Sequence, residues 1–337
     1  MNINKILSFS AWKNYPRNRL LSIKQSVNEK LVLYFYSRLN YDLDNALIIF
    51  GAPRSGTTWL MEILSSIKGI VPNFEPFHRF RGITKNRIDP TTFYPTYKPA
   101  DETMMVDFLV DVFSGRLFNP WTVSLAKLWH FRKPRFLLSK TVRANRLVPL
   151  ILREIAFPHP PVVIIRHPVP TCQSQLSSLS KNAKAPRLTP AKIDNSSHLI
   201  RQHKKILLAK HSDLAYQVIL WCLDHIDYLQ SPESHEKSVI TFYEDLLTSP
   251  LDETSRIIRQ MKISNVSSAE IRSINFTKAS RTDFNKDYRA SIVNQLNKGL
   301  NRLSVEEKKD IQDILDYFEI KIYSVSSPTP NKKFLAL

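Results

Sequence analysis

One short segment of the sequence combines residue types that bind a phosphate or sulfate group. Residues 51–59 have the sequence Gly-Ala-Pro-Arg-Ser-Gly-Thr-Thr-Trp and follow an apolar run at 46–50. The run predicts a buried strand, and the segment predicts a glycine-bounded turn that opens a helix. Backbone N–H groups and hydroxyls at a helix N-terminus favour an oxyanion. The chain has only six glycines, so the two in this turn, Gly51 and Gly56, indicate a backbone that requires them.

This segment differs from the phosphate-binding loop of nucleotide hydrolases. That loop has the pattern Gly-x-x-x-x-Gly-Lys-Ser/Thr, and its lysine reaches the β and γ phosphates. Gly51 and Gly56 have the right spacing, but Thr57 stands where the lysine is required, and Arg54 inside the loop is the cation instead. The difference favours another anionic group over a triphosphate. A P-loop nucleotide kinase or NTPase is the alternative, and magnesium-dependent ATP turnover would support it.

Composition and charge narrow the class of protein. The 337 residues are 43% hydrophobic and 10% aromatic, which is enough for a large core. The net charge is +18, and Lys and Arg are concentrated in residues 131–153 and 181–210. Such a surface attracts nucleotides, acidic glycans, anionic lipid headgroups or nucleic acid. No nucleic-acid-binding motif is present, so no nucleic-acid partner is expected. Cys172 and Cys222 fit neither a zinc site nor a disulfide framework.

The sequence predicts neither a membrane span nor a signal peptide. No apolar run approaches the roughly 18 residues that a spanning helix requires. The N-terminus lacks the apolar core and cleavage site of a signal peptide. We therefore expect a cytoplasmic protein. A short amphipathic piece near residues 6–12 is the place where a peripheral membrane contact could form. The sequence does not predict the oligomeric state.

Several elements must bring other polar residues to the loop at 51–59. Strands are expected at 46–50, 70–72, 135–140, 161–166 and 239–243. Helices are expected at 59–68, 101–130, 147–155, 198–230, 251–262 and 304–318, and one more begins after Pro170. Loops are expected at 79–100 and 181–197. This alternation indicates an α/β fold with a central parallel sheet. Ligands bind beyond the carboxyl ends of such strands. Arg54, Glu75, Arg166 and Tyr243 follow or close strands, so we expect them at one edge.

Three segments together resemble the cofactor-binding elements of PAPS-dependent sulfotransferases, where PAPS is 3′-phosphoadenosine 5′-phosphosulfate. Arg166-His167-Pro168 with Ser174 resembles a signature whose Arg and Ser hold the 3′-phosphate. Tyr243-Glu244-Asp245-Leu246 is similar to an element whose Tyr approaches the adenine. The residues similar to the family's 5′-phosphosulfate loop are Pro53, Arg54, Ser55, Gly56, Thr57, Thr58 and Trp59. The order and spacing of all three segments match the family.

The resemblance implies a fold, a reaction and further contacts. The fold is a P-loop-like three-layer sandwich at 45–325, between a helical N-terminal extension at 1–44 and a tail at 326–337. The reaction moves a sulfuryl group from PAPS to an acceptor hydroxyl or amine by in-line displacement, without a metal ion. Trp59 would offer a flat face to the adenine. Arg281 in a C-terminal loop would add a contact to the 3′-phosphate.

The general base distinguishes two branches of this family. Cytosolic small-molecule members place a His after Lys-Thr in a mid-chain strand, whereas this chain has Lys140-Thr141-Val142. Carbohydrate-type members use a Glu after the second strand, often as Glu-Pro, and Glu75-Pro76 fits. We predict Glu75 as the base, with His78 as the second candidate and Lys140 assisting at the leaving group. The expected acceptor is a hydroxyl on a carbohydrate or glycolipid.

Overall fold

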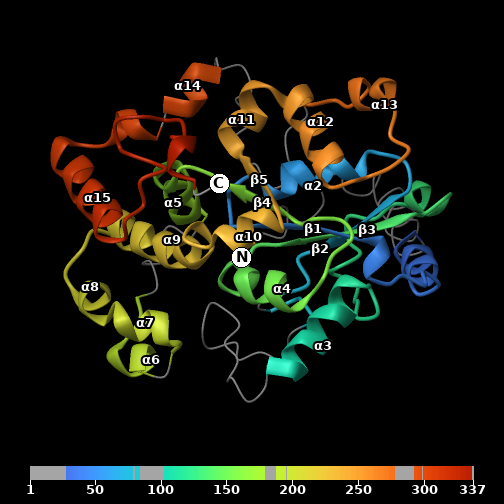
Figure 1. Ribbon diagram of the computed structural model, residues 1–337, viewed down its shortest axis with the longest axis horizontal. Helices are drawn as coiled ribbons and strands as arrows, with labels where there is room; N and C mark the ends of the chain where they lie inside the picture. Colours follow the sequence, from blue (N-terminus) through green and yellow to red (C-terminus); the bar gives the residue numbers. More distant parts are fainter. Residues whose placement is uncertain are drawn as a thin grey trace, which may run out of the picture.

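A five-stranded parallel sheet forms the centre of the fold (Figure 1). The computed structural model describes residues 28–78, 80–83, 102–178, 187–194, 196–277, 292–297 and 299–335. The strands are β1 (Ala46–Gly51), β2 (Ile70–Phe74), β3 (Phe136–Thr141), β4 (Val162–Ile165) and β5 (Val239–Phe242). Their order is β2-β3-β1-β4-β5, and every pairing is parallel. The expected α/β fold with a central parallel sheet is confirmed.

Helices connect the strands and cover both faces of the sheet (Figure 1). The α-helices are α2 (Thr57–Ser65), α3 (Glu102–Phe113), α4 (Val148–Glu154), α5 (Pro168–Ser177), α6 (Pro190–Asp194), α7 (His198–Gln202), α8 (Lys204–Leu208), α9 (Asp213–Leu229), α10 (Pro232–Glu236), α11 (Tyr243–Thr248), α12 (Pro250–Gln260), α13 (Ser268–Arg272), α14 (Ile292–Asn297) and α15 (Val305–Tyr317). Short 3-10 helices are η2 (Leu43–Asn45), η4 (Leu128–Phe131), η5 (Asn145–Leu147), η6 (Leu300–Arg302) and η7 (Lys332–Phe334). Residues 28–36 are also helical.

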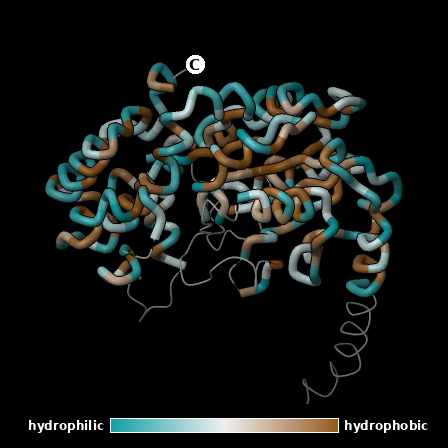
Figure 2. The backbone as a smooth tube through the Cα atoms, turned by 60° about the horizontal axis from the view of Figure 1, so that its bottom comes forward, coloured by the Kyte–Doolittle hydropathy of each residue, from teal (hydrophilic) through white to brown (hydrophobic). Residues whose placement is uncertain are grey.

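Alternate side chains of β1 face two different layers of helices. Ala46, Ile48 and Phe50 are buried in one apolar cluster with residues of α3, α4 and α9. Leu47 and Ile49 are buried in a second cluster with residues of α2 and α12. Figure 2 shows the apolar segments gathered along the sheet. The sheet is therefore the middle of three layers and is buried on both faces.

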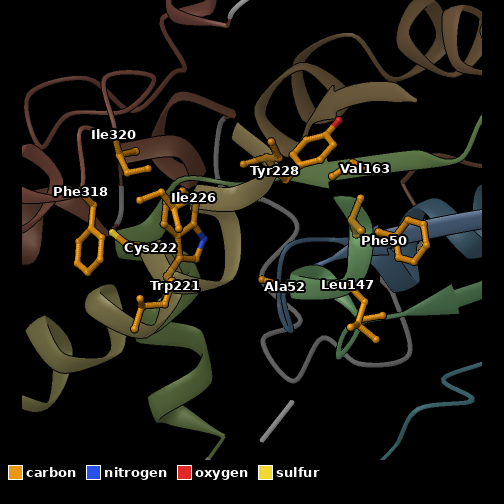
Figure 3. Packing of buried hydrophobic residues seen from close by; sticks show 14 of the residues in the cluster. Phe50, Ala52, Leu147, Val163, Trp221, Cys222, Ile226, Tyr228, Phe318 and Ile320 are labelled. Carbon is orange, nitrogen blue, oxygen red and sulfur yellow. The ribbon is translucent and has the colours of Figure 1, made fainter. Parts of the chain in front are cut away.

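The C-terminal part of the chain closes the first of these clusters. Trp221 and Cys222 of α9 lie in it together with Phe318 and Ile320, which follow α15 (Figure 3). Helix α9 also packs against α5 and α15. Leu335, in the predicted C-terminal tail, is buried in the same cluster. The division of the chain into three parts stays a prediction.

Two expected helices are shorter than the sequence pattern indicated. The helix expected at 101–130 ends at Phe113, and Gly115 follows with φ 73°, a conformation typical of helix ends. The helix expected at 198–230 is divided into α7, α8 and α9. Helix α9 has its own start, because the Ser212 side chain accepts a hydrogen bond from the N–H of Ala215.

Other boundaries move by a few residues. Helix α5 begins at Pro168, before the expected position, because proline is tolerated in the first helical turn and the His167 side chain caps it. The loop expected at 181–197 contains α6. The capping box expected at the start of α15 is present, between Ser304 and Glu307. None of the described helices is long and apolar enough to cross a membrane, and the amphipathic piece near residues 6–12 lies outside the described residues.

Candidate functional site

The turn after β1 places its two glycines where a side chain would clash. Gly56 has φ 95° and caps α2, and a Cβ atom there would lie 2.5 Å from Cδ2 of Tyr243. A Cβ atom at Gly51 would lie 2.7 Å from the carbonyl oxygen of Ile164. No side chain caps α2, so the N–H groups of its first turn are not occupied by a cap. The turn thus has the backbone of an anion site at a helix N-terminus.

Arg54 joins this turn to the second predicted anion site. Its Nε atom donates a hydrogen bond of 2.8 Å to Oγ of Ser174 on α5, and its carbonyl oxygen accepts one of 2.9 Å from Nη1 of Arg166. Gln175 binds the same turn, because its Nε2 atom donates to the carbonyl oxygen of Pro53 at 2.8 Å. Arg54 itself has φ 70°, which a non-glycine residue rarely adopts. These contacts bring the two arginines together at the carboxyl edge of the sheet.

Aromatic side chains lie beside the Arg166 guanidinium. Its carbon atom is 4.0 Å from the ring centroid of Tyr243, the first residue of α11. The ring of Tyr243 meets that of Trp59 edge-on, with centroids 6.0 Å apart. Tyr243 was expected to close β5, but the strand ends one residue earlier. The residue still lies at the carboxyl edge, next to Arg166.

A buried ion pair lies at the same edge, beyond β2 and β3. The parallel register pairs Phe74 with Lys140, and the N–H of Glu75 donates to the Lys140 carbonyl at 2.9 Å. The Lys140 Nζ atom then binds Oε1 of Glu75 and lies 4.8 Å from the ring centroid of Phe74. Glu75 has φ 44°, so it and Arg54 are two of the five described non-glycine residues with positive φ. Such strain is commonly held at functional sites.

Burial and the charge of Glu75 act on the pKa of Lys140 in opposite directions. The lysine side chain is only 1% exposed, whereas that of Glu75 is 15% exposed. Burial lowers the pKa of Lys140, and the carboxylate of Glu75 partly offsets this change. The carboxylate of Glu75 is therefore the group that stabilises the charged form of Lys140. The Glu75 side chain is the more exposed of the two.

His78 has its ring held by the loop that follows β2. Its Nδ1 atom accepts hydrogen bonds from the N–H groups of Arg81 at 3.1 Å and Phe80 at 3.3 Å. Burial lowers the pKa of His78, although the charge of Glu75 opposes this. A neutral imidazole that accepts at Nδ1 carries its proton on Nε2. The ring therefore presents a donor rather than a proton acceptor.

Two features of the site were missed by the sequence analysis. Arg143 follows β3, and its Nε atom is buried with no hydrogen-bond partner among the described residues. Only its place in the basic run at 131–153 could have indicated it. Behind Arg166, the carboxylate of Glu244 accepts from the His167 N–H at 2.9 Å and from the Tyr323 hydroxyl at 3.0 Å. This buried network ties the C-terminal segment to the strand end that carries Arg166.

The residues of the site fit an adenosine donor with phosphate groups at both ends. Arg54, Arg166 and the uncapped N–H groups of α2 are the donors that phosphate oxygens require. Thr57 and Thr58 are buried in the first turn of α2. The described residues contain no group of three or more His, Cys, Asp or Glu side chains that could hold a metal ion. Arg281 lies outside the described residues.

Comparisons with known proteins identify a family that this chain matches. A model of the sulfotransferase family matches residues 46–267. No curated protein matches the chain. A solved sulfotransferase domain from the curacin biosynthetic pathway aligns at 17% identity and TM-score 0.42, covering 82% of this chain and 97% of that one. Mouse sulfotransferase SULT7A1 complexed with PAP aligns at 13% identity and TM-score 0.43, with coverages of 86% and 89%. A sulfotransferase from Alicyclobacillus acidocaldarius aligns at 17% identity and TM-score 0.37, covering 80% of this chain and 95% of that one.

Proposed function

This chain belongs to the sulfotransferase family, and from that premise we propose that it transfers a sulfuryl group from PAPS to a hydroxyl of a carbohydrate or glycolipid, with Glu75 as the general base. One observation carries the proposal. Arg54 contacts both Ser174 and Arg166, so the turn after β1 and the residues after β4 share one edge of the sheet. A donor with a phosphosulfate at one end and a phosphate at the other would span these neighbouring groups.

Arg54 and the first turn of α2 would act on the 5′ end of the donor. Backbone N–H groups and a guanidinium at a helix N-terminus are fixed before the reaction, so they stabilise developing negative charge without rearranging. The negative charge develops on the phosphate oxygen that leaves the sulfur. PAPS supplies the activated sulfuryl group. We propose that Arg54, Thr57 and Thr58 stabilise the leaving oxygen.

Arg166, Ser174 and Tyr243 would hold the other end of the donor. Arg166 stands at the end of the buried strand β4, and its guanidinium lies against the Tyr243 ring at 4.0 Å. A guanidinium fixed in this way suits the two-pronged binding of a phosphate. Tyr243 and Trp59 meet edge-on and would supply the aromatic surface beside the adenine.

Glu75 is the better placed of the two candidate bases. Glu75 forms an ion pair with Lys140 and is 15% exposed, and a carboxylate can accept a proton. His78 has its Nδ1 lone pair engaged by two backbone N–H groups. We therefore assign proton removal to Glu75 and leave His78 as a structural neighbour that donates from Nε2.

The proposed step balances as an in-line displacement. Glu75 accepts the proton of the acceptor hydroxyl while that oxygen forms a bond to sulfur. The bond between sulfur and the 5′-phosphate oxygen breaks at the same time, and the electron pair stays on the phosphate. Arg54 and Lys140 stabilise this oxygen. The products are a sulfate ester and adenosine 3′,5′-bisphosphate, and the proton on Glu75 returns to solvent.

The test is a transfer screen with PAPS that carries radiolabelled sulfate. Sugars, glycolipids, phenols and amines are offered to the wild type, to Glu75→Gln and to His78→Gln. We expect label in a sugar or glycolipid product with the wild type and His78→Gln, and nearly none with Glu75→Gln. Transfer only to phenols or amines would overturn the acceptor class. Full transfer by Glu75→Gln would overturn the assignment of the base.

A further inference from the structure

Arg143 lies at the candidate site without a role in the reaction derived above. It is the third residue after Lys140, just beyond the end of β3, and its N–H donates to Oγ1 of Thr141 at 3.4 Å. Its positive charge is close enough to lower the pKa of both Lys140 and His78. Arg143 is therefore one of the charged groups around Lys140 and His78.

The electrostatics of this cluster leave a positive charge without a carboxylate. Lys140 is paired with Glu75, whereas no described acidic side chain forms an ion pair with Arg143. The Nε atom of Arg143 is buried and lacks an acceptor among the described residues. A buried donor without an acceptor costs free energy. An anionic ligand group that reaches Arg143 would supply both the acceptor and the opposite charge.

The position of Arg143 favours the acceptor over the donor as the source of that group. The donor's two charged ends are matched by groups that follow β1 and β4, which are neighbours in the sheet. Arg143 follows β3, which pairs with β1 on one side and on the other with β2, the strand that ends just before Glu75. Because the donor's charged ends already have basic partners and the reacting hydroxyl is assigned to Glu75, the acceptor is the better source of the group that binds Arg143.

We propose that Arg143 binds an anionic group of the acceptor, a carboxylate, sulfate ester or phosphate, close to the hydroxyl that is sulfated. This inference rests on the proposed function, because it uses Glu75 to place the hydroxyl. It narrows the acceptor to an acidic molecule. An arginine fork that binds such an anion would also hold the acceptor in register with Glu75.

The test measures binding of matched acceptor pairs to protein saturated with adenosine 3′,5′-bisphosphate. Methyl β-D-glucuronide is compared with methyl β-D-glucoside, and 4-hydroxybenzoate with 4-hydroxybenzamide. Glucose 6-sulfate and glucose 6-phosphate, compared with glucose, separate the sources of the anion. Calorimetry is carried out on the wild type, Arg143→Gln, Arg143→Lys and the control Arg132→Gln. Arg132 is an exposed arginine of the same basic run.

We expect the wild type to bind at least one anionic compound about ten- to a hundredfold more tightly than its neutral partner, as for hydrogen bonds to a charged group. Arg143→Gln should abolish this preference, Arg143→Lys should retain part of it, and Arg132→Gln should leave it intact. Affinity for adenosine 3′,5′-bisphosphate should stay unchanged in all variants, which also shows that they are folded.

Two results overturn the inference. Equal binding of anionic and neutral partners by the wild type would do so, whether or not any of them is sulfated. A preference that survives in Arg143→Gln would show that another group binds the anion. Failure of the wild type to bind adenosine 3′,5′-bisphosphate would instead overturn the proposed function, so the two failures are distinguishable.

Discussion

The Nε atom of Arg54 donates a hydrogen bond of 2.8 Å to Oγ of Ser174, which lies 120 residues further along the chain. This bond joins the turn after β1 to the helix after β4. Because the two segments are in contact, a ligand bound by one is within reach of the other. The contact also means that Arg54 is positioned by the fold before any ligand binds, which lowers the entropy cost of binding.

The first prediction concerns donor affinity. Arg54→Ala and Arg166→Ala should each weaken the binding of adenosine 3′,5′-bisphosphate about ten- to a hundredfold, because each removes a charged hydrogen-bond donor. Ser174→Ala should weaken it less, because it removes a neutral hydroxyl. Isothermal titration calorimetry measures the three affinities, with Arg132→Ala as an exposed control. Unchanged affinity in both arginine variants would contradict the proposed donor site.

The second prediction concerns the turn itself. Gly56→Ala should destabilise the fold by about 1–3 kcal/mol, because a Cβ atom there meets Tyr243 at 2.5 Å and φ is 95°. Donor binding should fall with it, since the turn must shift. Introducing Gly56→Ala into Tyr243→Ala would remove the clash but retain the unfavourable φ. In urea unfolding, Gly56→Ala should then cost less stability in the Tyr243→Ala protein than it does in the wild type. Equal losses in both backgrounds would mean that the clash is absent.

Strand ends explain why much of the site could be predicted from sequence. The apolar runs before Arg54 and Arg166 fix where β1 and β4 end, and parallel strands end at one edge. The same argument placed Glu75 there, whereas Lys140 was identified only through the family resemblance. The roles of both residues stay predictions. The contact between Lys140 and Glu75 depends on the register of β2 and β3, which the runs do not encode.

Other features depend on tertiary contacts that the pattern does not carry. Tyr323 reaches Glu244 only because the segment after α15 folds back over the sheet. No residue near Arg143 in the sequence sets it apart from the other arginines. Only the structure shows that its buried Nε atom lacks a hydrogen-bond partner among the described residues. The helix boundaries near residues 113 and 212 were missed for another reason. Gly115 is a local signal for a helix end and Ser212 one for a helix start. Both were missed because the apolar periodicity continues past them.

The third prediction separates catalysis by Glu75 from its structural role. Glu75→Gln should lower kcat by about a hundredfold or more, since a general base contributes roughly 10²–10⁴. It should also destabilise the fold, because Lys140 then lacks its carboxylate. Adding Lys140→Met removes the uncompensated charge and should restore stability without restoring activity. Recovery of activity in the double variant would show that Glu75 serves only to neutralise Lys140.

The fourth prediction concerns alkaline pH. Burial lowers the pKa of Lys140 from 10.5, so the lysine loses its proton at a lower pH than an exposed lysine does. If its charge stabilises the leaving oxygen, kcat/KM should fall as pH rises toward 10.5. Lys140→Arg, which keeps its charge, should remove this fall where the variant still binds adenosine 3′,5′-bisphosphate. The same alkaline fall in Lys140→Arg would assign it to another group.

The fifth prediction concerns stability at acid pH and His225, which lies away from the site. Its Nδ1–H donates to the Trp221 carbonyl at 2.7 Å, and burial lowers its pKa from 6.5 to about 4. Between these pH values the unfolded chain binds the proton and the folded chain does not. The free energy of unfolding therefore falls as the pH falls, by about 3 kcal/mol for this group.

The contribution of His225 can be isolated by substitution, because other buried groups titrate as well. His130 and His167 also have a pKa of about 4 from burial and act in the same direction. Burial raises the pKa of Glu244, so that carboxyl acts in the opposite direction. His225→Phe should flatten the pH dependence of urea unfolding, and the exposed control His198→Phe should not. Parallel curves for wild type and His225→Phe would mean that the pKa of His225 is the same in the folded and the unfolded state.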